Sequence, residues 1–349
     1  AVANTVVDPW SGHDIISGFE RYFDTNFADI LRGSALDEEF SLTSGNDVLD
    51  GRGGFDTVDY SQSWRWGASQ GITANLATGI ILDGWGNTDR VVNVEAIFGT
   101  NLNDNLTGNA LDNFFASGDG VDTVNGGAGR DKVGFWMVDD SETGHGVIVN
   151  LSLATKNVLD DGFGNVETVT GIEDLDGSRF ADKLIGTTGA NNLSGSDGND
   201  TLSGGQGNDT LVGDWGNDSI LGGLGDDVII GGVGRDVLTG HAGADGFIYF
   251  GFDGEEGDTV TDFEVGIDSF QLGAAGLFNL LAGDLQSAQF RSGAGVTTAS
   301  NTSQRIIYNT TTGDVYFDED GLGGVDAVLY ATLSNKAALS SSDFDIFFA

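Results

Sequence analysis

Six aspartates between residues 195 and 248 follow one another at intervals of nine residues. Each is the sixth residue of a nonapeptide that begins with glycine and carries a large apolar residue in its eighth place, as in GGQGNDTLV (204–212). Carboxylates in glycine-rich turns, beside unobstructed backbone carbonyls, are the oxygen ligands that Ca²⁺ binds in sets of about six to eight. The spacing therefore predicts calcium ligands at Asp200, Asp209, Asp218, Asp227, Asp236 and Asp245.

Each nonapeptide divides into a tight turn and a short strand. Glycine permits the positive φ that such a turn needs, and side chains alternate along a strand, so that the eighth residue faces inward. Two nonapeptides make one coil with a turn on each edge, and the eighth residues form a narrow core between two parallel sheets. The sequence thus predicts a right-handed parallel β-roll. One edge would carry Asp200, Asp218 and Asp236, and the other Asp209, Asp227 and Asp245.

The turn glycines are predicted to add backbone carbonyl ligands. A solvated acidic linker is the alternative interpretation, but a linker requires neither the fixed phase nor the apolar eighth residue. The glycines concerned are Gly195, Gly198, Gly204, Gly207, Gly213, Gly216, Gly222, Gly225, Gly231 and Gly234.

The composition favours divalent cations as partners. The 349 residues include 54 acidic and 14 basic ones, for a net charge of −40, together with 57 glycines and no cysteine. Nucleic acid and anionic membranes are poor partners for such a surface. No apolar run approaches the ~18 residues of a transmembrane segment. So large a charge predicts disorder until cations neutralise it.

The same nonapeptide phase recurs upstream in weaker form. It tiles residues 24–59, 99–134 and 177–194, the last running into the main block. The predicted organisation is a partial repeat with a first roll segment (1–59), an insert (60–98), a second roll segment (99–134), a second insert (135–176), the main roll (177–256) and a capping region with a secretion signal (257–349).

Most of the weaker nonapeptides keep the acidic sixth residue. Where it is Glu38, Asn113 or Asn191, the turn is expected to bind calcium weakly or to close without it. The further calcium ligands predicted in these segments are Asp29, Asp47, Asp56, Asp104, Asp122, Asp131 and Asp182.

The two inserts are copies of each other. Asn75-Leu76 matches Asn150-Leu151, and the DGWGN motif at 83–87 matches DGFGN at 161–165. Their β-branched stretches favour strands that extend or flank the roll. Aromatic residues in or beside the inserts either pack against the roll, the favoured interpretation, or form a carbohydrate-binding surface; they are Trp64, Trp66 and Trp136.

The two ends of the chain differ from the repeat segments between them. Residues 14–29 resemble the back half of a third copy, which suggests the C-terminal part of a longer protein or a cleavage product. After residue 248 the pattern stops, and Asp262 and Asp268, with Asp258, are expected to ligate the last ion. Phe263 and Phe270 are expected to plug the open end of the core, since solenoids need caps.

At these residues the chain resembles the RTX, or hemolysin-type, calcium-binding family, strongly over 177–349 and in diluted form over 24–176. The resemblance implies multiple Ca²⁺ ions and secretion from a Gram-negative bacterium by a type I apparatus that reads an uncleaved C-terminal signal, here Ser340–Phe348. It further implies export of an unfolded chain that folds in extracellular calcium and supports a larger protein. The alternative function is that of a surface-layer protein, an adhesin or a polysaccharide-binding protein.

Family members often carry a catalytic domain before the roll, and none is predicted within this chain. There is no HExxH zinc motif, and the histidines lie far apart in sequence. One G-x-S-x-G occurs around Ser69, but a nucleophile elbow needs a following helix, and Gly71 leads into a strand-like stretch. Paired carboxylates for glycosidase chemistry are uninformative in so acidic a chain. A hydrolase or a polysaccharide-modifying enzyme is therefore the least favoured function.

Overall fold

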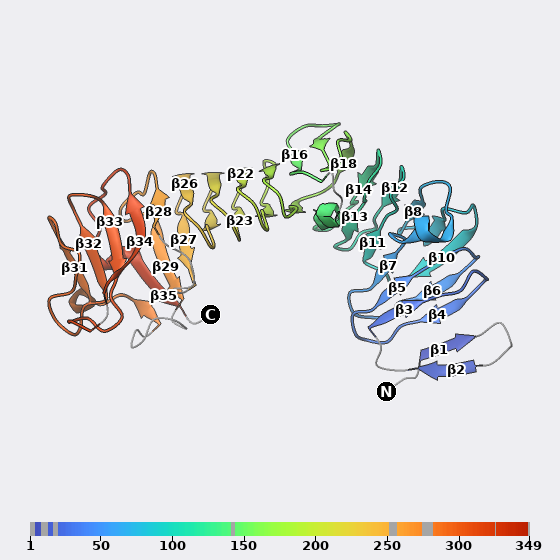
Figure 1. Cartoon of the computed structure of the whole chain (residues 1–349), viewed down its shortest axis with the longest axis horizontal. Coiled ribbons are helices and arrows are strands. Elements are labelled where there is room, and N and C mark those ends of the chain that lie inside the picture. The colour runs from blue at the N-terminus through green and yellow to red at the C-terminus, as the bar shows by residue number, and fades with distance from the viewer. Residues whose placement is uncertain are drawn as a thin grey trace. The chain divides into compact units, whose positions relative to one another are not determined.

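The computed structural model describes residues 4–7, 13–16, 20–140, 144–250, 257–273, 282–324 and 326–347. The chain divides into two compact units, Ala1–Ser178 and Arg179–Ala349. In the described residues both units consist of short β-strands joined by turns, and the helical elements are 3₁₀ turns of three to five residues. The predicted all-β fold is confirmed (Figure 1).

The second unit contains a parallel β-roll of two facing sheets. Residues one coil apart pair in register, so that Leu202 lies beside Ile220, and Ile220 beside Leu238. One sheet has the order β20 (Lys183–Ile185), β22 (Thr201–Gln206), β24 (Ser219–Leu224), β26 (Val237–Ala242) and β28 (Asp258–Val260). The other has β21 (Asn192–Ser194), β23 (Thr210–Val212), β25 (Val228–Ile230), β27 (Gly246–Tyr249) and β29 (Ser269–Gly273).

The apolar eighth residues form the core between these sheets, as predicted. They are almost completely inaccessible to solvent. Each is the central residue of a short strand segment and points inward, while its two neighbours point outward. They are Leu184, Leu193, Leu202, Leu211, Ile220, Ile229, Leu238 and Phe247.

The C-terminal residues cap this roll on both sheets. On one, β34 (Val328–Leu333) runs parallel to β28 and is followed in the sheet by β33 (Asp314–Phe317), β32 (Ile306–Asn309) and β31 (Phe290–Gly293). On the other, β35 (Phe344–Phe347) runs parallel to β29, and β30 (Gly283–Asp284) is antiparallel to β35.

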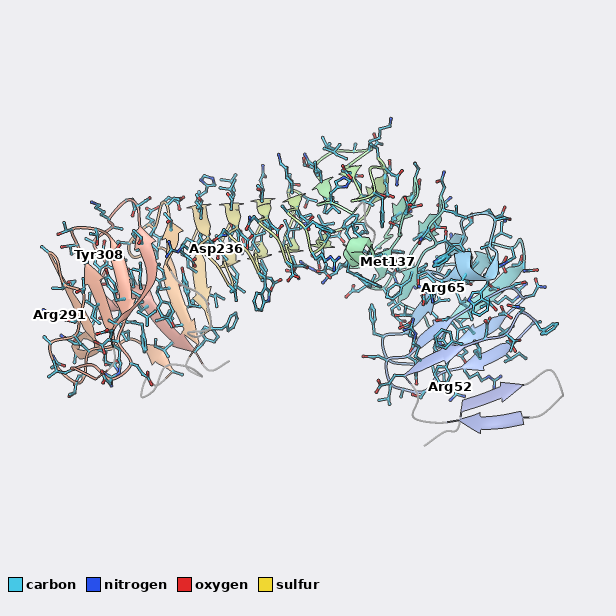
Figure 2. All side chains as sticks on the ribbon, viewed as in Figure 1. Arg52, Arg65, Met137, Asp236, Arg291 and Tyr308 are labelled. Carbon is cyan, nitrogen blue, oxygen red and sulfur yellow. The ribbon has the colours of Figure 1, made fainter. Side chains whose placement is uncertain are left out.

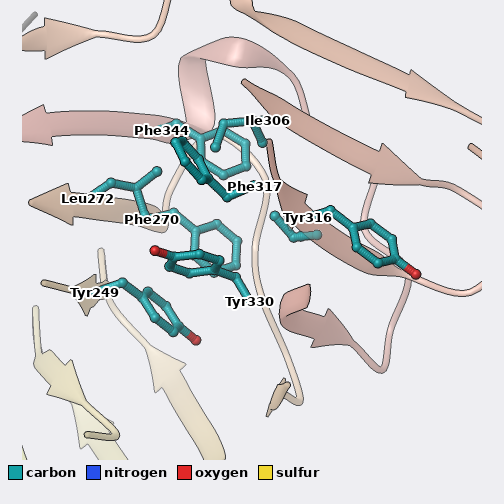
Figure 3. A pocket seen from close by; sticks show the side chains of 9 residues that line it. Tyr249, Phe270, Leu272, Ile306, Tyr316, Phe317, Tyr330 and Phe344 are labelled. Atoms are coloured by element: carbon teal, nitrogen blue, oxygen red, sulfur yellow. The ribbon is translucent and has the colours of Figure 1, made fainter. Parts of the chain in front are cut away.

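Aromatic side chains fill the space between the roll and its cap. Phe270 stacks on Phe263 at a ring-centroid distance of 5.0 Å and on Phe344 at 5.2 Å. Beyond them lies a small apolar pocket that Tyr249, Phe317 and Tyr330 also line (Figure 3). The expectation that Phe263 and Phe270 close the core is confirmed, since both are buried.

The first unit is also a parallel roll, and a hairpin interrupts one of its sheets. The uninterrupted sheet has the order β3 (Arg21–Phe23), β5 (Glu39–Ser41), β7 (Thr57–Asp59), β11 (Ala96–Phe98), β13 (Phe114–Ala116), β15 (Lys132–Gly134) and β19 (Asp174–Asp176). The other has β4 (Ile30–Arg32), β6 (Val48–Asp50), β10 (Thr88–Val92), β9 (Ile80–Leu82), β8 (Thr73–Asn75), β12 (Asn105–Thr107), β14 (Thr123–Asn125) and β18 (Thr168–Thr170). A separate hairpin joins β1 (Asn4–Val7) to β2 (His13–Ile16).

Only the first part of each expected insert departs from the roll. That part holds a 3₁₀ turn, η1 (Ser63–Trp66) or η2 (Trp136–Asp140), followed by an antiparallel hairpin: β8–β9, or β16 (Ile148–Asn150) with β17 (Val158–Asp160). Residues 84–98 and 162–176 then form one further coil each, because β10 and β11, like β18 and β19, pair in parallel with roll strands.

Candidate calcium sites along the edges of the rolls

The turns of the second unit stack so closely that their fourth residue must be glycine. The fourth residue of each interior turn has a positive φ, for example +146° at Gly216, and a Cβ there would lie 1.3 Å from the carbonyl oxygen of Gly198. The second residue is also left-handed, even where it is Ser196, Asp214 or His241. Stacked in this way, the turns bring their backbone carbonyls together.

In each aspartate of the main block, one carboxylate oxygen accepts a hydrogen bond from the backbone of the coil before it. Oδ1 of Asp218 accepts a hydrogen bond of 2.7 Å from the backbone N–H of Asp200, and Oδ1 of Asp236 accepts one of the same length from Asp218. The other edge repeats the pattern from Asp209 to Asp227 and on to Asp245. The predicted division of the aspartates between two edges is confirmed; Figure 2 labels Asp236 on the first of them.

The second carboxylate oxygen, Oδ2, is buried and accepts no hydrogen bond. In Asp218 it lies so close to Gly213, the first residue of the same turn, that a Cβ on Gly213 would be 2.3 Å from it. A buried polar atom of this kind ordinarily has a partner, so a repeated orphan points to a ligand. The aspartates that share the feature are Asp47, Asp56, Asp122, Asp131, Asp200, Asp218, Asp227, Asp236 and Asp245.

The electrostatics of the edges oppose the ionised form of these acids. Burial, followed by the charges of neighbouring carboxylates, raises the pKa of Asp200 from 3.8 to about 8, that of Asp236 to about 7 and that of Asp245 to about 6, although a backbone hydrogen bond lowers each. A cation among the carboxylates would remove this penalty. Orphan carboxylate oxygens beside stacked carbonyls form an all-oxygen donor set, which fits Ca²⁺ and disfavours softer metals.

The first turn of a stack differs from the turns that follow it. There, the sixth side chain accepts a hydrogen bond from the second residue of its own turn: Asp29 from Thr25, Asp104 from Thr100 and Asn191 from Thr187. Glu38 and Asn113 do the same with Ser34 and Asn109. An amide oxygen serves this purpose as well as a carboxylate, which explains why asparagine occurs at opening turns.

Several residues on the edges were missed by sequence reasoning. The carboxylate of Asp24, the first residue of its nonapeptide, lies with those of Asp29 and Asp47 in a group whose ligand atoms are all within 4.8 Å of one another. Asp89 accepts the N–H of Asp47 and so continues the same edge. Asp89 could have been found from the sequence, because Asp89-Arg90-Val91 has the order of the sixth to eighth residues of a nonapeptide. Nothing in the nonapeptide template marks Asp24.

Glutamates continue the other edge of the first unit. Glu95 accepts the N–H of Asp56, and Glu173 accepts the N–H of Asp131. In both places only two residues separate the glutamate from the preceding strand, β10 or β18, so a longer side chain is needed to reach the preceding coil. This shortening broke the nine-residue phase and hid both residues.

The three acids expected at the end of the main roll have different roles. Asp258 and Asp268 extend the two edges, since their Oδ1 atoms accept the N–H groups of Asp236 and Asp245. Asp262 instead accepts the N–H groups of Gly240 and His241 and caps that turn. Asp258 and Asp268 therefore lie where ligands to the last ions are expected, whereas Asp262 lies beside the turn.

The other residues singled out in the sequence lie away from these edges. Trp64 and Trp66 are 56% and 60% exposed, while Trp136 packs edge-on against Phe98 at 5.2 Å. Ser69 is exposed and is followed by strand β8 rather than by a helix, so the nucleophile-elbow geometry is absent there.

These observations define a class of protein: a parallel β-roll with rows of buried carboxylates along its edges. The family model of the RTX calcium-binding nonapeptide repeat matches the chain in four copies, at residues 23–58, 98–133, 176–211 and 212–247. The chain is thus an RTX-repeat protein, and repeats of this kind bind multiple Ca²⁺ ions.

Two solved structures resemble the chain. A repeat subunit (AlgE6R3) of the mannuronan C5-epimerase of Azotobacter vinelandii is 26% identical, with 49% of this chain and 80% of that one covered and a TM-score of 0.21. The extracellular lipase LipA of Serratia marcescens is 16% identical, with 95% of this chain and 41% of that one covered and a TM-score of 0.20. No curated protein gives a significant sequence match. In the described part of the chain, no helix has the length and apolarity to cross a membrane.

Proposed function

We propose that this chain is a secreted module that folds when it meets extracellular calcium and thereby supports the export and folding of a larger protein. The observation that carries the proposal is the row of buried Oδ2 atoms without hydrogen-bond donors, which recurs at nine aspartates of the two rolls. The aspartates with orphan oxygens and the carbonyls of the turn glycines are the proposed ligands. Bound Ca²⁺ would supply the positive charge that allows the carboxylates to stay buried and ionised.

The dependence of folding on calcium follows from the charge of the chain and the affinity of its sites. A chain with a net charge of −40 repels itself, and its edges bring carboxylates together. Extracellular calcium modules bind with dissociation constants of about 10⁻⁴–10⁻³ M, so such a site would stay empty at cytosolic calcium and fill outside the cell. Because the ligands converge only in the folded roll, the free energy of binding becomes free energy of folding.

Far-ultraviolet circular dichroism during a calcium titration of the full chain tests this proposal. We expect mostly coil in chelator and β-structure at millimolar Ca²⁺. Mg²⁺ should substitute poorly, because it demands a smaller octahedral site and releases its water reluctantly. A β-rich spectrum that is identical in chelator and in calcium would refute the proposal.

The C-terminal strand is proposed to act both as a secretion signal and as part of the cap. Strand β35 pairs with β29, and Asp343 just before it accepts a hydrogen bond from the N–H of Gly266. A signal that is exposed in the unfolded chain and covered after folding suits export by a type I apparatus. Any catalytic domain is proposed to lie in another part of the larger protein.

Binding of an extracellular or cell-surface polysaccharide is the second candidate. Trp64 and Trp66 are both more than half exposed on the 3₁₀ turn η1, and aromatic faces stack on sugars. Replacement of Trp64, Trp66 and Trp136 by alanine should abolish glycan binding if this function holds. Trp215→Ala, which removes a 63% exposed tryptophan of the second unit, is the control. Equal glycan retention by all variants would exclude this surface.

A further inference from the structure

An aromatic cluster lies on the outer face of the uninterrupted sheet of the first unit. Phe98 of β11 and Phe114 of β13 meet edge to face at a ring-centroid distance of 6.0 Å, and Trp136 of η2 packs against Phe98 at 5.2 Å. The residues beside the two phenylalanines in these strands, Ile97 and Phe115, point into the core. Trp136 is 42% exposed and the two phenylalanines are half-buried, so the cluster presents aromatic surface to solvent.

Small residues make room for these rings. An alanine lies beside each phenylalanine in the register of β11 with β13. Gly134 does not have a positive φ, yet a Cβ on it would lie 2.8 Å from the ring of Phe114 and 3.2 Å from that of Trp136. The packing of the rings, and not the backbone conformation, therefore requires glycine at this position.

The equivalent place in the other copy of the insert is polar. Tyr60 and Phe135 begin the two inserts with the same backbone hydrogen bond, which each N–H donates to the carbonyl of the last residue of the next strand in the sheet. Phe135 is flanked by the glycine and the tryptophan of the cluster, whereas Tyr60 is flanked by Asp59 and Ser61. Asp59 is buried, and its Oδ1 accepts the N–H of Ser61. The aromatic cluster is thus a feature of one copy and not a requirement of the repeated fold.

Two ion pairs flank the cluster on the same face. Lys132 lies beside Phe114 in register, and its Nζ donates to the two carboxylate oxygens of Asp176 at 3.0 and 3.1 Å. Nε and Nη2 of Arg130 donate to the two carboxylate oxygens of Asp174 at 2.8 and 2.7 Å. Each pair holds donors and acceptors in fixed positions and carries no net charge.

We propose that the surface formed by Phe98, Phe114, Trp136 and the two ion pairs binds a neutral polysaccharide. The C–H groups of a pyranose ring pack against the electron-rich face of an aromatic ring, and its hydroxyl groups need hydrogen-bond donors and acceptors close by. The rings supply the first and the ion pairs supply the second. The inference rests on the second candidate function, and it names the site and the class of glycan.

Charge and area favour this occupant over others. An anionic polysaccharide would be repelled, because the chain has a net charge of −40 and the cations of this surface are already paired. A stable protein interface needs about 800 Å² on each partner. Three rings of at most about 250 Å² each, all partly buried, supply only a fraction of that area. A sugar chain needs no more than a few rings.

Affinity electrophoresis of the full chain in saturating calcium tests the inference. The gels contain dextran, galactomannan or xyloglucan as neutral probes and hyaluronan as the anionic one. We expect a neutral glycan to retard the wild type and hyaluronan not to. Trp136→Ala should weaken this binding at least about tenfold, as the loss of a central tryptophan does in other interfaces. Trp136→Phe, which keeps an aromatic face, should retain most of it.

A second variant leaves the rings in place. Lys132→Ala/Asp176→Ala removes an ion pair whose side chains are 37% and 33% exposed, and exposed pairs contribute little to stability. This variant should fold as the wild type does, by circular dichroism, and bind the glycan several-fold more weakly. It therefore tests the surface even if Trp136→Ala does not fold.

The double variant Trp64→Ala/Trp66→Ala is the matched control, since it removes two exposed tryptophans of the same unit, and it should bind as the wild type does. Loss of binding in this control, with binding retained by Trp136→Ala, would overturn the inference and place glycan recognition at η1. Retardation by hyaluronan alone would overturn the neutral class. A folded wild type that no glycan retards would overturn both the inference and the second candidate function, whereas calcium-dependent folding has its own test.

Discussion

In the aspartates of the rolls, the two carboxylate oxygens have different roles. One oxygen accepts the backbone N–H of the preceding coil, for example Oδ1 of Asp227 from Asp209 at 2.9 Å, and so sets the register of the edge. The other is buried without a donor. The first interaction survives replacement by asparagine, because an amide oxygen also accepts a hydrogen bond. The second does not, because asparagine has a single side-chain oxygen and its amide nitrogen cannot bind a cation.

Asp227→Asn should therefore raise the calcium concentration at the folding midpoint. The loss of one charged interaction is worth about 1.5–3 kcal/mol, which corresponds to roughly a tenfold to hundredfold change in an equilibrium constant. Asp226→Asn is the control, since Asp226 is exposed and its Oδ1 accepts only the N–H of Ala244. Calcium titration by circular dichroism measures both midpoints. Equal midpoints for the two variants would contradict a ligand role for Asp227.

The same acids make folding depend on pH. Burial raises the pKa of Asp200 to about 8 and that of Asp227 to about 6, from 3.8. In chelator, the folded form then binds more protons than the unfolded form, so its stability is greatest in acid and is lost as the pH rises through 6 to 8.

Calcium requires the deprotonated ligands, so its affinity for the folded roll should weaken as the pH falls. Folding follows a different balance: above pH 6 these acids are deprotonated in the unfolded chain, and protons stabilise the calcium-free roll. The calcium concentration at the folding midpoint should therefore fall as the pH falls from 8 to 6. Titrations at three pH values, with ionic strength held constant, provide the measurement. A midpoint that is constant over this range would show that the edge carboxylates do not titrate there.

At the scale of the element, opening turns and interior turns are built differently. An opening turn closes on itself through its sixth side chain, as Asn191 does with Thr187. An interior turn lies against the carbonyls of the turn before it and leaves an oxygen for a cation, as Asp218 does. Ion sites are therefore expected between stacked turns and not at an isolated one.

Gly216→Ala and Gly189→Ala separate these two kinds of turn. A Cβ at Gly216 would meet the carbonyl oxygen of Gly198 at 1.3 Å, with φ at +146°, whereas a Cβ at Gly189 has its nearest neighbour at 3.8 Å. Both are the fourth residue of a nonapeptide in the second unit. Gly216→Ala should cost roughly 3 kcal/mol or more of the free energy of unfolding, as overpacking of a tight site does. Gly189→Ala should cost less than about 1 kcal/mol. Urea unfolding in saturating calcium measures both, and similar losses would contradict the distinction.

At the scale of the whole molecule, each roll is a narrow solenoid whose stability depends on its ends. Each strand of the second unit contributes one apolar side chain to a narrow core. The side chains of the last coil would therefore be exposed to solvent without a cap. Strands β34 and β35 extend the two sheets past β28 and β29, and a cluster of phenylalanines fills the space between them.

Phe270→Ala should open this end of the roll. Phe270 is 1% exposed, and its loss should cost about 3–5 kcal/mol, as buried Phe→Ala changes do. The calcium midpoint of the second unit should rise accordingly. Phe250→Ala, at a residue 46% exposed, is the control and should have a small effect. Thermal unfolding in calcium compares the two variants; equal unfolding temperatures would show that the cap contributes little.

The nine-residue repeat alone predicts the roll, the inward eighth residues and the assignment of alternate aspartates to two edges. These features are local, since each nonapeptide carries its own turn glycines, its acid and its apolar residue, as at Gly213, Asp218 and Ile220. Stacking then repeats the same contacts every 18 residues, so the pattern can be read without coordinates.

Coordinates are needed to see which carboxylates lack a partner and which residues outside the repeat join them. Tyr60 and Asp89 are 29 residues apart, and the hydrogen bond between their side chains depends on where the hairpin β8–β9 returns the chain. Asp24 and Glu95 occupy places that no nine-residue template marks, because the distance between two side chains is set by the stacking of coils and the length of each turn, not by spacing along the chain.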